Sequence, residues 1–184
     1  ILFTSTYGAL NAQVWNKSFT AGAYDSNNKL LGGSEVLQLI GHKKMLFASV
    51  GYWEDANNIW YGGSNSNIGW SQINRLDNPL ANWQEDFFLG ASYLRPEILK
   101  QIIFTKDQSG NSLSSPDTVL ICAGYTTNFF TSSVTVKSFV RNDENGTWGE
   151  SQIMQGSTPG GANYSIRDIE MHVDQQTGLE YVFA

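Results

Sequence analysis

Aromatic residues stand beside Asn or acidic residues at three points in the sequence, and this combination suits the binding of sugars. The points are Tyr52-Trp53-Glu54-Asp55-Ala56-Asn57, Asn82-Trp83-Gln84-Glu85-Asp86 and Tyr125-Thr126-Thr127-Asn128. Aromatic rings offer flat apolar faces for stacking, while amide and carboxylate groups form hydrogen bonds with hydroxyls. The candidate ligand-binding residues are Tyr52, Trp53, Glu54, Asp55, Asn57, Trp83, Tyr125 and Asn128.

Two pairs of neighbouring acids, Glu54-Asp55 and Glu85-Asp86, could supply the two carboxylates of a glycosidase. Neighbouring acids in loops are, however, more often simply solvated. The sequence contains no Gly-x-Ser-x-Gly elbow, no phosphate-binding loop and no dinucleotide-binding fingerprint. We therefore expect no catalytic residue and no cofactor. The alternative is an enzyme whose active site is completed by further sequence.

Metal-binding patterns are weak in this sequence. Asp107-Gln108-Ser109-Gly110-Asn111 and Asp143-Glu144-Asn145-Gly146 resemble parts of a calcium loop, but both lack its alternating carboxylates and closing Glu. His42 and His172 have no second His or Cys at ligand spacing. The single cysteine, Cys122, lies in an apolar run and is expected to be a small buried hydrophobe. We expect no metal site.

The composition favours a turn-rich β protein. Of 184 residues, 41% are hydrophobic and only 15% are charged, and there are 18 glycines. Helical proteins are instead enriched in Ala, Glu, Lys and Leu. The net charge of −6 argues against nucleic acids and anionic membranes as partners. No apolar run reaches the roughly 18 residues that span a bilayer, so no membrane insertion is expected.

Apolar runs that narrow to small residues and then present a tyrosine recur along the chain. They span residues 1–8, 45–53 and 119–126 and lead to Tyr7, Tyr52 and Tyr125. A fourth run, 179–184, has the same apolar opening. Short apolar runs with Gly at the exit are typical of buried strands. The alternative to ligand binding for these tyrosines is packing at the strand ends.

Three further classes of strand accompany these runs. One precedes them, at 34–42, 96–105 and 167–174, and another follows them, at 12–19, 58–65 and 133–142. The last class is expected at 68–74, at 146–154 and within 20–32. Its two clear members share a tryptophan, Trp70 or Trp148, followed by Ser-Gln-Ile. We expect both indoles to pack between repeats, and residues 75–95 to form a long loop.

Four antiparallel strands that recur predict a β-propeller, in which each repeat is one blade. We expect a single domain over residues 1–184, with blades at 1–33, 34–95 and 96–155 and an incomplete one at 156–184. About three blades are fewer than a typical ring contains, so further blades or copies of the chain would close it. An open two-layer β sandwich is the alternative arrangement of the same strands.

The chain resembles secreted microbial and fungal β-propeller proteins. In that family an Asp-x-x-Thr-Gly turn leads into a strand ending in Phe-Ala-Gly, and here residues 173–178 lead to Tyr181-Val182-Phe183-Ala184. The resemblance implies that the loops after Tyr7, Tyr52 and Tyr125, with the insertion between residues 74 and 95, surround one mouth of a central channel. It also implies a secreted protein whose ligand, a carbohydrate or another small polar molecule, binds at that mouth.

The remaining expectations concern processing and alternatives. The chain opens on Ile1 rather than Met, which fits either a removed leader or a piece of a longer protein. Glycosylation sequons occur at Asn16, Asn145 and Asn163, about as many as chance would give in a chain with this much Asn, Ser and Thr. Besides a lectin-like module and an enzyme, an assembly protein that links chains by strand addition is a third hypothesis.

Overall fold

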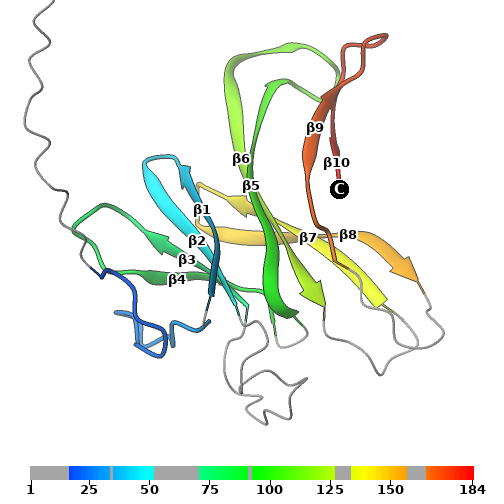
Figure 1. The fold of residues 1–184 in the computed structure, drawn as a ribbon. Helices are drawn as coiled ribbons and strands as arrows, with labels where there is room; N and C mark the ends of the chain where they lie inside the picture. Colours follow the sequence, from blue (N-terminus) through cyan, green and yellow to red (C-terminus); the bar gives the residue numbers. More distant parts are fainter. Residues whose placement is uncertain (1–16, 34, 52–70, 91–92, 127–133, 157–164) are drawn as a thin grey trace, which may run out of the picture.

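The computed structural model describes residues 17–33, 35–51, 71–90, 93–126, 134–156 and 165–184 (Figure 1). None of these residues lies in a helix, so the predicted all-β class is confirmed for the part described. The strands are β1 (Glu35–His42), β2 (Met45–Gly51), β3 (Gln72–Leu76), β4 (Gln84–Phe88), β5 (Tyr93–Lys106), β6 (Ser112–Thr126), β7 (Val134–Asn142), β8 (Thr147–Gly156), β9 (Glu170–Val173) and β10 (Glu180–Phe183).

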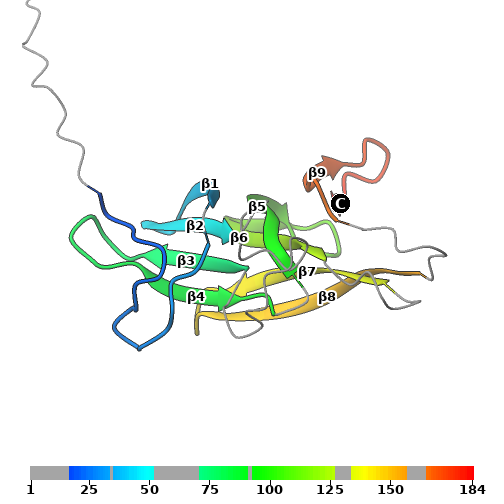
Figure 2. The ribbon, with the colours of Figure 1, turned by 60° about the horizontal axis from the view of Figure 1, so that its bottom comes forward.

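The strands form two four-stranded sheets and one two-stranded sheet. The first sheet has the order β1-β2-β3-β4, the second has the order β5-β6-β7-β8, and β9 pairs with β10. Every pairing is antiparallel and joins strands that are neighbours in sequence. Figure 2 shows the two larger sheets lying against each other, with β9 beyond the second. Antiparallel sheets of four strands are therefore present twice, as the sequence predicted.

The second strands of the two sheets, β2 and β6, are buried on both faces. Along β2, Phe47 and Ala48 enter different hydrophobic cores, and along β6 Leu120 and Ile121 separate in the same way. Successive side chains of a strand point to opposite faces of the sheet, so both faces of each strand are covered. This double burial explains why these segments are continuous apolar runs, and it confirms the burial that the runs predicted.

Among the described residues, three hydrophobic cores lie between the layers. The first core packs the segment 17–33 on the first sheet through Leu31, Ala48, Val50 and Trp83. The middle core joins the two sheets through Phe47, Ile73, Leu89, Tyr93, Leu99, Leu120, Cys122 and Phe139. The last core joins the second sheet to the segment leading into β9 through Ile98, Ile102, Ile121, Ala123, Val136, Ile166 and Ile169.

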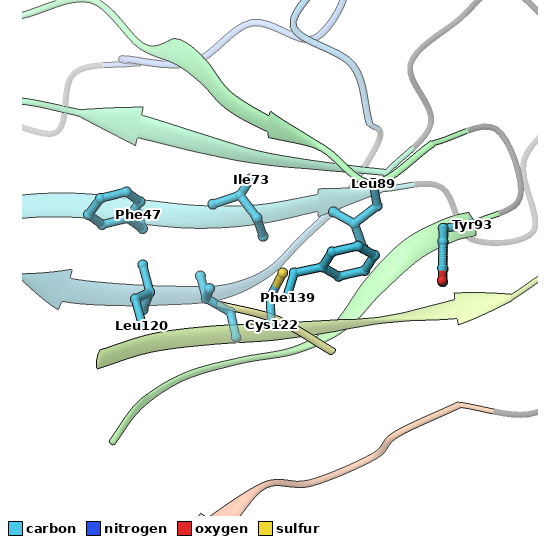
Figure 3. Close-up of a cluster of buried hydrophobic side chains, with 8 residues drawn as sticks. Phe47, Ile73, Leu89, Tyr93, Leu120, Cys122 and Phe139 are labelled. Carbon is cyan, nitrogen blue, oxygen red and sulfur yellow. The ribbon is translucent and has the colours of Figure 1, made fainter. Parts of the chain in front are cut away.

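The middle core fixes the two sheets face to face (Figure 3). Phe47 and Ile73 come from the first sheet, and Leu120, Cys122 and Phe139 come from the second. All of them are at most 4% exposed. Burial raises the pKa of the Cys122 thiol well above its usual value, and the residue acts as the small buried hydrophobe that was predicted.

The structure corrects the outer strands of the first sheet. The segment predicted as its fourth strand, 68–74, contains the start of β3, which pairs directly with β2 and is therefore the third strand. The fourth strand, β4, lies in the segment predicted to be a long loop, 75–95. The predicted strand 58–65 lies outside the described residues. The Ser-Gln-Ile tripeptide misled the prediction, because it falls on the third strand of one sheet and the fourth strand of the other.

The segment predicted to hold a fourth strand of the first unit, 20–32, forms a tight turn instead. Tyr24 and Leu30 make an isolated antiparallel bridge. Inside it, Asp25 Oδ1 accepts hydrogen bonds from the backbone N–H groups of Asn27 and Lys29, both at 2.8 Å. A side chain that binds backbone donors in this way stabilises a turn rather than a strand.

The two strands predicted near the C-terminus are confirmed as β9 and β10. Asp174 Oδ1 closes the turn between them by accepting from the N–H groups of Gln176 and Thr177, and Gly178 has a φ of 70°. Only glycine adopts such a φ at little cost. In contrast to β2 and β6, β10 is exposed: the exposed fractions are 44% for Tyr181 and 58% for Phe183.

Candidate functional site

Most of the predicted ligand-binding residues lie outside the described part of the chain. This holds for Tyr52, Trp53, Glu54, Asp55, Asn57 and Asn128, and for the sequon residues Asn16 and Asn163. Tyr125 lies near the end of β6. The strands that lead into these segments, β2 and β6, both end on the lower side of the molecule in Figure 1. Gly51 and Thr126, the last residues of these strands, therefore lie on the same side of the two sheets.

Trp83 lies in the first core. Trp83 is only 7% exposed, and its Nε1–H donates to Ser18 Oγ at 3.2 Å. Its ring meets the ring of Phe19 edge to face, with 6.3 Å between the centroids. Trp83 also precedes β4, at the end of the first sheet opposite to the end of β2. It holds the segment 17–33 on the sheet, and we leave it out of the proposed ligand face.

Glu85 and Asp86 point to opposite faces of the first sheet. Glu85 pairs with Asn74 across the sheet, and its carboxylate accepts from Gln72 Nε2 at 2.7 Å. Burial raises the pKa of Glu85; Lys29 opposes this shift and Asp25 adds to it. Because Asp86 projects to the other face, the two carboxylates do not converge on one substrate. The geometry does not support this pair as the acids of a glycosidase.

A β-bulge places Asp86 on the face that meets the second sheet. In the pairing of β3 with β4, Ile73 is opposite Phe87 and Asn74 is opposite Glu85, so Asp86 is the extra residue. A bulge re-aims the side chain of its extra residue and bends the strand. Phe87 packs against the middle core, and Asp86 contacts residues of the second sheet on the same side.

Asp86 is the centre of a buried ionic network between the sheets. Its oxygens accept from Arg75 of its own sheet and from Arg141 of the second sheet, whose Nε lies 2.8 Å from Oδ2. Trp148 Nε1–H donates to the same Oδ2 at 2.8 Å. The side chains of Asp86 and Arg141 are 1% and 3% exposed. Three donors thus compensate a carboxylate whose burial would otherwise be very costly.

A second carboxylate, Asp143, extends the network. Its Oδ1 accepts from Arg141 at 2.6 Å, and its Oδ2 lies 2.9 Å from His42 Nε2 and 2.8 Å from Lys43 Nζ. The other ring nitrogen of His42 lies 3.0 Å from Gln101 Oε1. Burial acts to raise the pKa of Asp143, but the hydrogen bonds from Lys43, His42 and Arg141 outweigh it and lower that pKa to about 2.

We call this network the clasp. It contains His42, Lys43, Arg75 and Asp86 from the first sheet and Gln101, Arg141, Asp143 and Trp148 from the second. With Asp77, which binds Arg75, it has three acidic and three basic side chains, so its charges balance when His42 is neutral. The clasp lies at the end of the sheets where β2 begins, opposite to the ends of β2 and β6. Arg75 and Asp86 belong to the insertion that was predicted to line the mouth, so the structure places this part of the insertion at the other end of the sheet. The role of the clasp is to hold the sheets together.

Sequence reasoning found only part of the clasp. It can anticipate only the local ion pair between Arg141 and Asp143, which lie two residues apart. It missed the links from Arg141 to Asp86 and from Asp143 to His42, because these partners are 55 and 101 residues away in sequence. Trp148 was expected to pack between repeats, and its indole does stack on Phe87 with 5.1 Å between ring centroids. Trp70 lies outside the described residues.

The two segments that resemble calcium loops form turns. Asp107 Oδ1 accepts from the N–H groups of Ser109 and Asn111, and Asp143 is engaged in the clasp. Over the described ranges, no three or more His, Cys, Asp or Glu side chains are grouped in a way that could hold a metal ion. In the same ranges, no helix has the length and apolar character needed to cross a membrane.

No family model, no curated protein and no solved structure matches this chain. What the protein does is therefore inferred from its own residues and their arrangement.

Proposed function

We propose that this chain is a β-propeller-type recognition module that binds carbohydrate and has no catalytic centre of its own. One observation carries the proposal: the doubly buried strands β2 and β6 end on the same side of the stacked sheets (Figure 1). The sequence that follows each strand is rich in aromatic residues, Asn and acids, from Tyr52 to Asn57 and from Tyr125 to Asn128. Loops displayed by a rigid scaffold are where binding residues concentrate.

The chemistry of these two segments suits a sugar. Trp53 supplies a broad apolar ring, and Glu54, Asp55, Asn57 and Asn128 supply acceptors and donors for hydroxyl groups. The rest of the proposal follows from the same residues and from the resemblance to secreted propellers: the protein is extracellular, and its propeller is completed by further blades or by copies of the chain.

Carbohydrate binding is tested on a glycan array, followed by titration with the sugars that bind. We expect Trp53→Ala to weaken binding about fivefold or more, because loss of one good aromatic stacking contact costs on the order of 1 kcal/mol or more. The matched control is Leu80→Ala, since Leu80 is an apolar side chain that is 97% exposed in the turn between β3 and β4. This variant should bind like the wild type.

Two results would count against the lectin-like function. One is the absence of binding to any sugar on the array, and the other is a Trp53→Ala variant that binds as well as the wild type. Hydrolysis of a chromogenic glycoside that is abolished by Glu54→Gln would instead favour the enzyme, with Glu54 and Asp55 as its acids.

A second candidate, an assembly function, is favoured by the edge of β10, which pairs only with β9 among the described residues. Tyr181, Val182 and Phe183 are 44%, 38% and 58% exposed. In the two larger sheets, the corresponding strands β2 and β6 are covered at the same edge by a third strand, β3 or β7. Exposed strand edges readily accept another strand. We propose that a further antiparallel strand completes this sheet.

A further inference from the structure

The turn between β7 and β8 carries the sequence Asn145-Gly146-Thr147, which fits the acceptor pattern for N-glycosylation. The pattern alone has little weight, because the chain contains as many copies as chance would give. Asn145 differs from Asn16 and Asn163 in that its surroundings are described. These surroundings decide whether a glycan could be attached to it.

One side of this turn is fixed to the protein and the other side is exposed. On the inner side, Asp143 is held in the clasp and its side chain is 12% exposed. On the outer side, Asn145 and Thr147 are both exposed. Gly146 joins them with a φ of 72°, and its N–H donates to the carbonyl oxygen of Asn142 at 2.8 Å. The clasp therefore holds the turn so that Asn145 faces solvent.

The hydrogen bonds of Asn145 leave its amide nitrogen available. Asn145 Oδ1 accepts from the backbone N–H of Thr147 at 3.0 Å and from the Thr147 hydroxyl at 2.7 Å. Both bonds use the oxygen, so the side chain is held in place while Nδ2 remains the free end. Donation to the oxygen also polarises the amide and makes its N–H more acidic, which assists the loss of a proton from the nitrogen.

We propose that Asn145 is an N-glycosylation site. The co-reactant is a sugar whose anomeric carbon is bonded to a phosphate leaving group, and a glycosyltransferase presents it. Asn145 Nδ2 forms a bond to the anomeric carbon, the bond from that carbon to the phosphate oxygen breaks, and the phosphate leaves with the electron pair. One amide proton passes to a base of the transferase. Glycosylation in the natural setting depends on the secretion put forward in the proposed function, but the acceptor geometry does not.

The site is tested by directing the full chain through the secretory pathway of eukaryotic cells. Treatment with peptide-N-glycosidase in ¹⁸O-labelled water converts each glycosylated Asn to labelled Asp, which mass spectrometry locates. We expect label at residue 145. It should be lost in Thr147→Ala and retained in Thr147→Ser, because Ser keeps the hydroxyl that bonds to Asn145 Oδ1. A digest without the enzyme corrects for spontaneous deamidation.

The chain contains its own negative control. Asn78 also accepts, at 3.0 Å, from the N–H of the residue two places on, but that residue is Leu80 and has no hydroxyl. Asn78 should stay unlabelled. Absence of label at Asn145 in the secreted, folded wild type would overturn the proposal, as would full labelling in Thr147→Ala. An unmodified Asn145 in protein from its natural source, together with a labelled recombinant chain, would contradict the proposed secretion and leave the site intact.

Discussion

The clasp shows how single residues determine the way the two sheets meet. Asp86 is an acid on an interior face of a sheet, and it can remain there because Arg75, Arg141 and Trp148 all donate to it. The bulge in β4 gives it the required direction. Buried ion pairs contribute little net stability relative to apolar residues, but removing one partner leaves the others uncompensated.

Asp86→Ala should destabilise the protein by about 3–5 kcal/mol, because the buried guanidinium group of Arg141 and the partly exposed one of Arg75 lose their shared acceptor. Urea unfolding followed by circular dichroism measures this change. Glu150→Ala is the control: Glu150 lies 2.7 Å from Lys137 in an ion pair whose acid is 59% exposed. Such a surface pair contributes about 1 kcal/mol or less. Equal losses for the two variants would show that the clasp does not join the sheets.

Burial was predictable for some residues, and long-range contacts were not. The apolar surroundings of Cys122 in the sequence predicted its burial correctly. Trp83 has polar neighbours in the sequence, which gave no sign that it would pack beneath the segment 17–33. The partners of Asp86 come from three other strands, and no spacing within β4 indicates them.

At the level of the strands, β6 shows why an apolar run ends in a small residue. Gly124 lies near the end of β6, under the ring of Tyr93. A Cβ added at Gly124 would lie 2.3 Å from Tyr93 Cδ1 and 2.8 Å from Leu89 Cδ2. The small side chain therefore leaves room for the aromatic ring that closes the middle core.

Gly124→Ala should destabilise the protein by about 1–3 kcal/mol, because overpacking a filled core forces its neighbours to move. Gly41→Ala is the matched control in β1: no atom lies within 4 Å of the added carbon, and the φ of Gly41 is not positive. That change should be neutral or slightly stabilising, by about 1 kcal/mol at most. Thermal unfolding of both variants compares them. A Gly124→Ala protein as stable as the wild type would mean that the Tyr93 ring does not pack on β6 as described.

The sequence predicted the strands that hairpin turns join, and failed for the outer strands of the first sheet. β1 with β2, β5 with β6, and β9 with β10 are antiparallel pairs whose apolar runs stand out. The short sequence of β4 predicts a loop, because Gln84, Glu85 and Asp86 dominate it. β4 nevertheless forms part of the sheet, because Gln72 donates to Glu85 and both Arg75 and Arg141 donate to Asp86. These polar partners satisfy side chains at positions where strand periodicity would predict apolar residues.

At the scale of the molecule, the same packing step is repeated. The segment 17–33 packs on the first sheet, the first sheet on the second, and the second sheet on the region of β9. Repetition of one face-to-face contact is the principle of a propeller, in which each unit buries its neighbour's face. The described residues show this step but no closed ring. The patterns in the sequence predict individual strands. The contacts between sheets, which would decide a closed ring, are not specified by the sequence of any one strand.

The structure of the native particle, determined by crystallography or electron cryomicroscopy, tests the architecture most directly. We predict that the four-stranded sheets lie radially around a common axis, with a third strand paired to β10 and the segments after Gly51 and Thr126 at one mouth of the central channel. A two-layer sandwich closed on itself, with the outer edge of β10 facing solvent, would contradict the propeller and the ligand face derived from it.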